Sequence, residues 1–251
     1  MLPHDEAGSG PALVLLHAGI ADRTMWGEHL QPLAEAGYRV VAPDLPGFGE
    51  TPMAQDEDAP WTDVLRTMDE LGVERAALVG NSFGADVALR VALVAPDRVS
   101  ALVLCGTRAP GVGPSSELEA VWEAESAAYD RGDIEAAVAA VVDAWTLPEA
   151  SNALRERVAA MQRRAYELQA EESTAVEAPD PLEQHPEALA GLDVPTLAVV
   201  GERDKPDFRE SAELLARTLP RGRLAVMEGA GHLAPLEAPE AFRELTVGFL
   251  R

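Results

Sequence analysis

Short, largely apolar runs alternate with longer amphipathic segments along most of this chain. The runs are short enough to be strands buried on both faces, and they lie at residues 12–16, 38–42, 76–80, 101–105, 196–200 and 223–227. Helical periodicity is clearest at residues 24–36, 60–71 and 208–219. This alternation, with connections of right-handed crossover length, predicts an α/β fold: a mostly parallel sheet with helices on both faces.

The alternation stops between residues 109 and 190. This segment opens with a Pro- and Gly-rich stretch and then carries no strand signal. Its composition is rich in Ala and Glu, and helices are expected at residues 115–130, 133–145 and 148–170. We therefore expect a helical insertion at 109–190 in a core formed by residues 1–108 and 191–251.

The most informative motif is Gly80-Asn-Ser-Phe-Gly84, which joins the strand at 76–80 directly to a helix beginning at Phe83. A strand that runs through G-x-S-x-G into a helix is typical of a nucleophile elbow, whose sharp turn lifts the serine Oγ above the strand ends. A Cβ at Gly80 or Gly84 would meet the neighbouring chain. Ser82 is therefore the candidate nucleophile, and the N–H of Phe83 is a candidate oxyanion donor.

On these residues the chain resembles the α/β-hydrolase family over nearly its whole length, except for about residues 110–190. The resemblance implies that His17-Ala-Gly19 is the oxyanion loop, with the Gly19 N–H as donor, although Ala18 replaces the commonest glycine. The family also has a β-hairpin before the first parallel strand. Few residues precede Pro11, so this hairpin must be missing or reduced, which leaves about six strands. An insertion at the position of 109–190 is a helical cap over the active site in the family.

A serine hydroxyl becomes a good nucleophile only when a base takes its proton, and a carboxylate must orient that base. Asp204 follows the strand at 196–200, and His232 follows the last strand in a Gly-x-Gly-His motif. Ser82, Asp204 and His232 thus all follow the carboxyl ends of predicted strands, in the chain order expected for this fold. They are the predicted catalytic triad, with Glu202 and Asp207 as alternatives for the acid.

Other polar residues are better explained by structural roles. His17 is expected to be a hydrogen-bonded scaffold residue rather than the base, and Asp44 a loop-fixing acceptor in a Pro/Gly-rich turn that the resemblance marks as structural. Cys105 ends an apolar run and is expected to be a small buried hydrophobe. Surface roles are expected for the remaining histidines, His4, His29 and His185.

Composition narrows the function further. The 251 residues are 47% hydrophobic, enough for the full core of one domain with an insertion. A formal net charge of −23 disfavours nucleic acid and anionic membranes as partners. No apolar run approaches a membrane span, the first ten residues do not resemble a signal peptide, and the single cysteine fits a reducing compartment, so a cytoplasmic location is expected. The sequence has no metal-ligand spacing, P-loop or G-x-G-x-x-G, and no cofactor or metal is implied.

These observations predict a capped serine hydrolase that cleaves a carboxylic ester or lactone of a small, largely apolar substrate through an acyl-enzyme. The candidates for the substrate pocket are Ile20, Trp122, Trp145 and Leu233. Tryptophans in such helices equally serve to seal a cap against a core. The elbow serine argues against epoxide hydrolases and haloalkane dehalogenases, which use an aspartate there.

Three alternatives stay open. The elbow Gly-Asn-Ser-Phe-Gly also resembles that of hydrolases that cleave carbon–carbon bonds, but the longer glycine-rich oxyanion loop of those enzymes is absent. A cofactor-free perhydrolase would use the same triad. A non-catalytic ligand-binding member of the fold is the third alternative. The sequence leaves the oligomeric state open.

Overall fold

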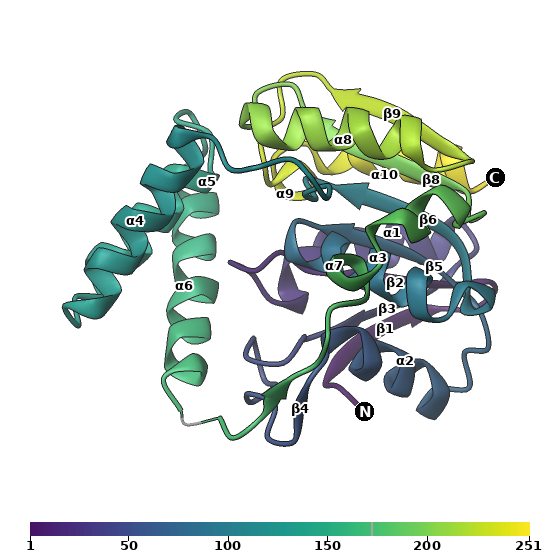
Figure 1. Cartoon of the computed structure of the whole chain (residues 1–251), viewed down its shortest axis with the longest axis horizontal. Coiled ribbons are helices and arrows are strands. Elements are labelled where there is room, and N and C mark those ends of the chain that lie inside the picture. Colours follow the sequence, from purple (N-terminus) through teal and green to yellow (C-terminus); the bar gives the residue numbers. More distant parts are fainter. Residues whose placement is uncertain (172) are drawn as a thin grey trace.

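The computed structural model describes residues 1–171 and 173–251. Its core is one twisted sheet with helices on both faces (Figure 1), in the strand order β1-β3-β2-β5-β6-β8-β9. The predicted α/β fold is confirmed. The strands are β1 (His4–Gly8), β2 (Ala12–Leu16), β3 (Arg39–Pro43), β5 (Ala76–Asn81), β6 (Val99–Cys105), β8 (Thr196–Gly201) and β9 (Gly222–Met227).

The strands from β2 onward run parallel, and β1 pairs antiparallel with β3. In the part of the chain that the structure describes, this sheet has seven strands rather than about six, because the hairpin is reduced to one antiparallel edge strand, β1, and is not lost. β1 is polar and has no apolar run, so hydrophobic pattern alone does not reveal it. It is fixed by its ladder to β3 and by Arg39, whose Nε donates to Glu6 Oε1 at 2.6 Å.

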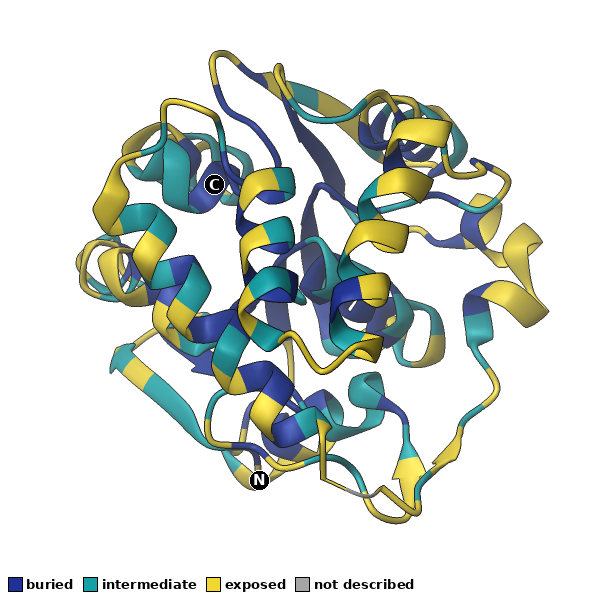
Figure 2. Ribbon diagram, turned by 90° about the vertical axis from the view of Figure 1, so that its left-hand side faces the viewer, coloured by how far each residue is buried: buried dark blue, intermediate teal, exposed yellow. Residues whose placement is uncertain are grey.

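The helices of the core form two layers. Leu33 of α1 (Gly27–Glu35) and Phe242 of α10 (Pro239–Leu250) belong to the hydrophobic cluster on one face of the sheet. The other face packs against α2 (Pro60–Glu70), α3 (Phe83–Val94) and α8 (Pro206–Thr218). Alternate residues of the strands enter the two clusters. The central strands are buried, whereas the edge strands β1 and β9 and the outward turns of the helices are largely exposed (Figure 2).

The long helices within residues 109–190 stand beside the sheet rather than within its layers (Figure 1): α4 (Ser116–Asp130), α5 (Ile134–Trp145) and α6 (Asn152–Gln169). Each begins at a side-chain N-cap, and the cap at Ser151 explains why α6 starts later than the pattern suggests. We call residues 109–190 the insertion.

After α6 the chain returns to the core through short elements. The strand β7 (Val176–Glu177) pairs in parallel with β4 (Glu57–Asp58), and this two-stranded sheet links the insertion to a core loop. The helix α7 (Pro181–Gln184) follows, and a further short helix, α9 (Ala234–Glu237), lies between β9 and α10.

The expected surface role of His29 is wrong. Its side chain is 1% exposed, and its Nε2 lies 2.9 Å from the carbonyl oxygen of Pro235. The rings of Trp26 and Phe242 contact it edge-on. This carbonyl satisfies one ring nitrogen, whereas Nδ1 is buried without a hydrogen-bond partner among the described residues, where α1 packs against α10. Burial lowers the pKa of His29 to about 4.

Within the described residues, every helix is too short or too polar to cross a membrane. Cys105 is buried as expected, and burial raises the pKa of its thiol well above the usual value.

Candidate active site

Ser82 occupies a strained turn between β5 and α3. Its backbone has φ 51° and ψ −118°, and it is the only non-glycine residue with positive φ in the described parts of the chain. A Cβ at Gly80 would lie 2.4 Å from the backbone nitrogen of Ala85, and one at Gly84 would lie 2.2 Å from the carbonyl oxygen of Leu16. Only glycine fits at either position, which is the geometry of a nucleophile elbow.

His232 and Asp204 meet at the carboxyl edge of the sheet. Nδ1 of His232 lies 3.0 Å from Oδ2 and 3.2 Å from Oδ1 of Asp204. The two side chains are 5% and 1% exposed. Since a carboxylate only accepts, Nδ1 carries the hydrogen, and the other ring nitrogen, Nε2, is left with a free lone pair.

The alternative acids are engaged elsewhere. Oε2 of Glu202 accepts from the N–H of Gly229 at 2.9 Å. The carboxylate of Asp207 accepts from the backbone N–H and, at 2.7 Å, from the hydroxyl of Ser115. Asp204 is therefore the carboxylate that the fold brings to His232.

Two contacts connect the elbow with the loop that carries His232. Nδ2 of Asn81 donates to the carbonyl oxygens of His232 at 3.0 Å and of Cys105 at 3.2 Å. Gly106 has φ +64°, and a Cβ there would lie 3.0 Å from Cε1 of His232. Among the described residues no hydrogen bond joins Ser82 Oγ to His232, and such bonds often tighten only when substrate binds.

The backbone of Gly19 lies beside the start of α3. A Cβ at Gly19 would be 3.3 Å from Cβ of Phe83, so the two candidate oxyanion donors come from adjacent pieces of chain. His17 holds the first of these pieces: its Nδ1 lies 2.8 Å from the Ala18 carbonyl oxygen, and its Nε2 accepts from the N–H of Leu45 at 2.9 Å. Because Nε2 accepts from the Leu45 N–H, it carries no hydrogen, and burial lowers the pKa of His17 in agreement with this. The expected scaffold role of His17 is confirmed.

Asp44 also holds a loop, as expected. Its Oδ1 accepts from the N–H of Arg23 at 2.7 Å, its Oδ2 from the N–H of Glu50 at 2.9 Å, and the Arg23 guanidinium pairs with the same carboxylate. With every oxygen engaged, Asp44 has no free role in chemistry.

The pocket candidates lie at different distances from the site. The ring centroid of Trp145, at the end of α5, is 4.5 Å from that of His232. Trp122 is 37% exposed and instead lies beside the guanidinium of Arg108, at 5.4 Å. Leu233 is fully buried, and Ile20 is half-buried against both core clusters. Of the four, Trp145 is the one that the structure brings to the histidine ring.

Sequence reasoning misses two residues that surround the site. The ring of Phe208 on α8 lies 4.3 Å from His232, centroid to centroid. Nζ of Lys205, next to Asp204, donates to the carbonyl oxygen of Ala144 at 2.6 Å and lies 4.4 Å from the Trp145 ring centroid. The sequence does show that Lys205 and Phe208 closely follow Asp204. It does not show what they contact, because His232, Ala144 and Trp145 lie far from them along the chain.

No group of three or more His, Cys, Asp or Glu side chains is arranged to hold a metal ion in residues 1–171 and 173–251. The site combines an imidazole oriented by a carboxylate, a serine in a strained turn, and the candidate N–H donors of Gly19 and Phe83. Such a combination suits nucleophilic attack on a carbonyl carbon.

The sequence model of the alpha/beta hydrolase fold matches residues 11–239. The chain is similar to 2-hydroxy-6-oxo-6-phenylhexa-2,4-dienoate hydrolase of Comamonas testosteroni, at 28% identity over 100% of this chain and 91% of that protein. It is 30% identical to 2-hydroxymuconate semialdehyde hydrolase of Pseudomonas sp. (strain CF600), over 98% of this chain and 89% of the relative. A thermophilic esterase from Thermogutta terrifontis, solved with malate bound, superposes with a TM-score of 0.81 and 28% identity, over 100% and 93% of the two chains. The chain belongs to the α/β-hydrolase family.

Proposed function

We propose that this protein is a serine hydrolase that cleaves a carboxylic ester or lactone of a small, largely apolar substrate. Ser82 Oγ attacks the carbonyl carbon while Nε2 of His232 takes its proton. The Gly19 and Phe83 N–H groups hold the oxyanion, and Asp204 orients the imidazole and stabilises its charged form. His232 then returns the proton to the leaving alcohol, and water, activated by the same imidazole, cleaves the acyl-enzyme.

One observation carries this proposal: Nδ1 of His232 lies 3.0 Å from Oδ2 of Asp204, and the His232 carbonyl oxygen accepts from Asn81, the residue before the strained Ser82. A buried carboxylate fixes the tautomer that a general base needs, and strained backbone is retained where the chemistry uses it. We further propose that the insertion is a cap, that Trp145, Leu233 and Ile20 line the acyl pocket, and that the protein acts in the cytoplasm.

A second candidate is cleavage of a carbon–carbon bond. It is favoured by the relatives from Comamonas and Pseudomonas, whose names describe hydrolases of a dienoate and of a semialdehyde. That reaction also passes through an oxyanion on a carbonyl carbon, so the same triad serves it. Ester or lactone hydrolysis is preferred because the loop His17-Ala-Gly19 lacks the longer glycine-rich form expected of carbon–carbon hydrolases.

A substrate panel separates the two. Purified protein is assayed with p-nitrophenyl acetate and butyrate, with a series of lactones, and with 2-hydroxy-6-oxo-6-phenylhexa-2,4-dienoate, with Ser82→Ala as the control for each. The proposal expects the highest kcat/KM on an ester or lactone and its loss in Ser82→Ala. A higher kcat/KM on the dienoate would make the second candidate correct. Full activity of Ser82→Ala on every substrate would refute both.

A further inference from the structure

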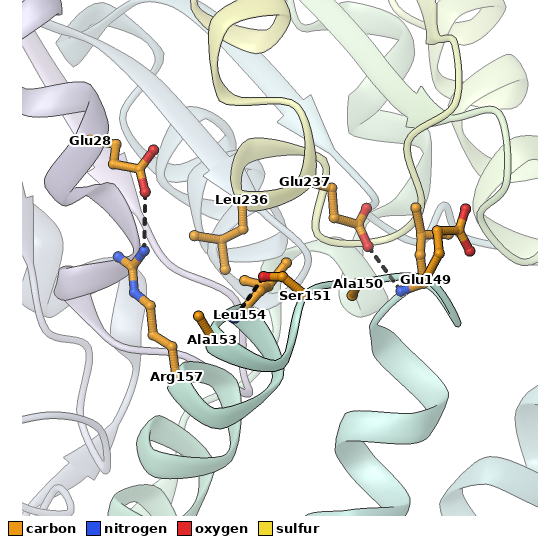
Figure 3. Close-up of a pocket in the computed structure, with 10 residues that line it drawn as sticks. Glu28, Glu149, Ala150, Ser151, Ala153, Leu154, Arg157, Leu236 and Glu237 are labelled. Carbon is orange, nitrogen blue, oxygen red and sulfur yellow. Dashed lines mark hydrogen bonds and ion pairs between the residues drawn. The ribbon is translucent and has the colours of Figure 1, made fainter.

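Glu237, the last residue of α9, joins the catalytic loop to the insertion. Its Oε2 accepts from the N–H of Gly231 at 2.7 Å, and its Oε1 accepts from the N–H of Leu147 at 3.2 Å. Gly231 immediately precedes His232, and Leu147 lies two residues after Trp145. Figure 3 shows the carboxylate of Glu237 pointing at the turn that carries Glu149 and Ala150.

The packing around this carboxylate leaves little freedom. A Cβ on Gly231 would lie 2.9 Å from Cδ2 of Leu147 and 3.2 Å from Oε2 of Glu237. The peptide before His232 is thus enclosed between the turn of the insertion and Glu237. A shift of either neighbour would move the backbone that carries the imidazole.

The charge of Glu237 is not explained by an ion pair. No Lys or Arg lies within 4 Å of it in the described residues, and burial is the main cause that raises its pKa. The two N–H donors and the nearby His232 act in the opposite direction, and Asp204 adds to the rise. Glu237 is half-buried, and removing a carboxylate from water even in part is unfavourable unless hydrogen-bond donors or a nearby positive charge offset the loss.

We propose that Glu237 is a positioning residue for the catalytic histidine. It fixes the Gly231–His232 peptide against the turn after α5, and its negative charge favours the imidazolium that forms when Ser82 loses its proton. The inference rests on the proposed function, because it assigns His232 as the base. In this assignment two carboxylates position His232: Asp204 contacts the imidazole ring, and Glu237 acts through the backbone N–H of Gly231.

The chain offers a matched comparison in Glu149. Glu149 and Glu237 line the same cavity of about 450 Å³, together with Glu28 and Arg157, which pair with each other at 3.5 Å (Figure 3). Glu149 also joins the insertion to the core, through Arg203 Nη2 at 3.1 Å, but it does not touch the loop of His232.

The first experiment compares Glu237→Gln with Glu149→Gln on p-nitrophenyl acetate. Glutamine has the same shape but only one acceptor atom and no charge, so kcat should fall about 10- to 100-fold with KM changed less than about threefold. Glu149→Gln should keep the wild-type kcat. Equal losses in both variants would mean that any contact between insertion and core has this effect, and would overturn the inference. So would an unchanged kcat in Glu237→Gln.

The second experiment does not depend on turnover. The pKa of His232 is measured by NMR of its imidazole in Ser82→Ala and in Ser82→Ala with Glu237→Gln. Loss of a neighbouring negative charge should lower that pKa by about half a unit or more, and an unchanged value would count against the charge role. If Glu237→Gln melts below the assay temperature, Glu237→Asp, which keeps the charge but cannot span both N–H groups, should show the fall in kcat with a smaller change in pKa. Wild-type kcat in Glu237→Asp would contradict the bridging role.

The two proposals fail differently. Wild-type protein that cleaves no substrate of the panel would refute the proposed function. An active wild type with equally active Glu237→Gln would refute only the role of Glu237.

Discussion

The indole of Trp145 lies against the imidazole of His232, with their ring centroids 4.5 Å apart and the ring planes at 42°. This contact crosses from the insertion to the core. Phe208 contacts the same imidazole from α8, and Lys205 holds the end of α5 through the Ala144 carbonyl oxygen. The orientation of the ring is therefore set partly by the insertion and not by the core alone.

Replacing Trp145 should weaken catalysis more than replacing the other tryptophan of the insertion. In Trp145→Leu the imidazole loses one of its two aromatic contacts, and we expect kcat/KM on p-nitrophenyl acetate to fall about tenfold. Trp122→Leu should stay within about twofold of wild type, because Trp122 contacts Arg108 rather than the proposed triad. A larger loss in Trp122→Leu than in Trp145→Leu would reverse this assignment.

Asp204→Asn should almost abolish activity while the fold persists. An amide can donate to Nδ1, which would leave the hydrogen on Nε2 and remove the base; the analogous change in a well-studied serine protease lowers kcat about 10⁴-fold, and we expect a loss of about 10³-fold or more here. Glu202→Gln is the control, because Glu202 only accepts from Gly229. Steady-state kinetics on both variants decides: comparable losses would mean that Asp204 is not the acid.

His29 should make the protein less stable in mild acid. Its pKa is about 4 in the folded state, below the ordinary value of 6.5, so between these values the unfolded chain binds more protons and stability falls as pH falls. Between pH 7.5 and pH 5 this group alone lowers the free energy of unfolding by about 2 kcal/mol at most.

The variant His29→Gln tests this directly. A glutamine amide can still donate to Pro235 but does not titrate, so the loss of stability from pH 7.5 to pH 5 should be smaller in the variant. Urea unfolding at both pH values measures it. His17 is buried with a lowered pKa and contributes in the same direction, so some acid sensitivity should remain. An identical pH dependence in variant and wild type would show that His29 does not titrate on unfolding.

The parts of this site that are local in sequence could be predicted from it. The elbow at Ser82 follows from two glycines and a strand–helix junction within a few residues, and Asp204 and His232 follow from their places after predicted strands. The edge strand β1 could not be read from hydrophobic pattern because it is polar and is fixed by its partner β3.

Residues whose role depends on distant packing were missed. His29 is mid-helix in sequence, and only the approach of α10 and of the Pro235 carbonyl buries it. Glu237 follows an apolar stretch, where a lone carboxylate is a visible signal, but its two partners lie 6 and 90 positions away. Nothing in the local sequence identifies those partners.

The central claim is that Ser82 is activated for nucleophilic attack, and reaction with a fluorophosphonate tests it most directly. Such a reagent labels a serine only when a base and an oxyanion site have activated it. Intact mass after exposure should show one adduct, mapped by peptide digestion to Ser82, and none in Ser82→Ala; His232→Ala should label far more slowly. Folded wild-type protein that carries no adduct, or carries it on another residue, would contradict the account.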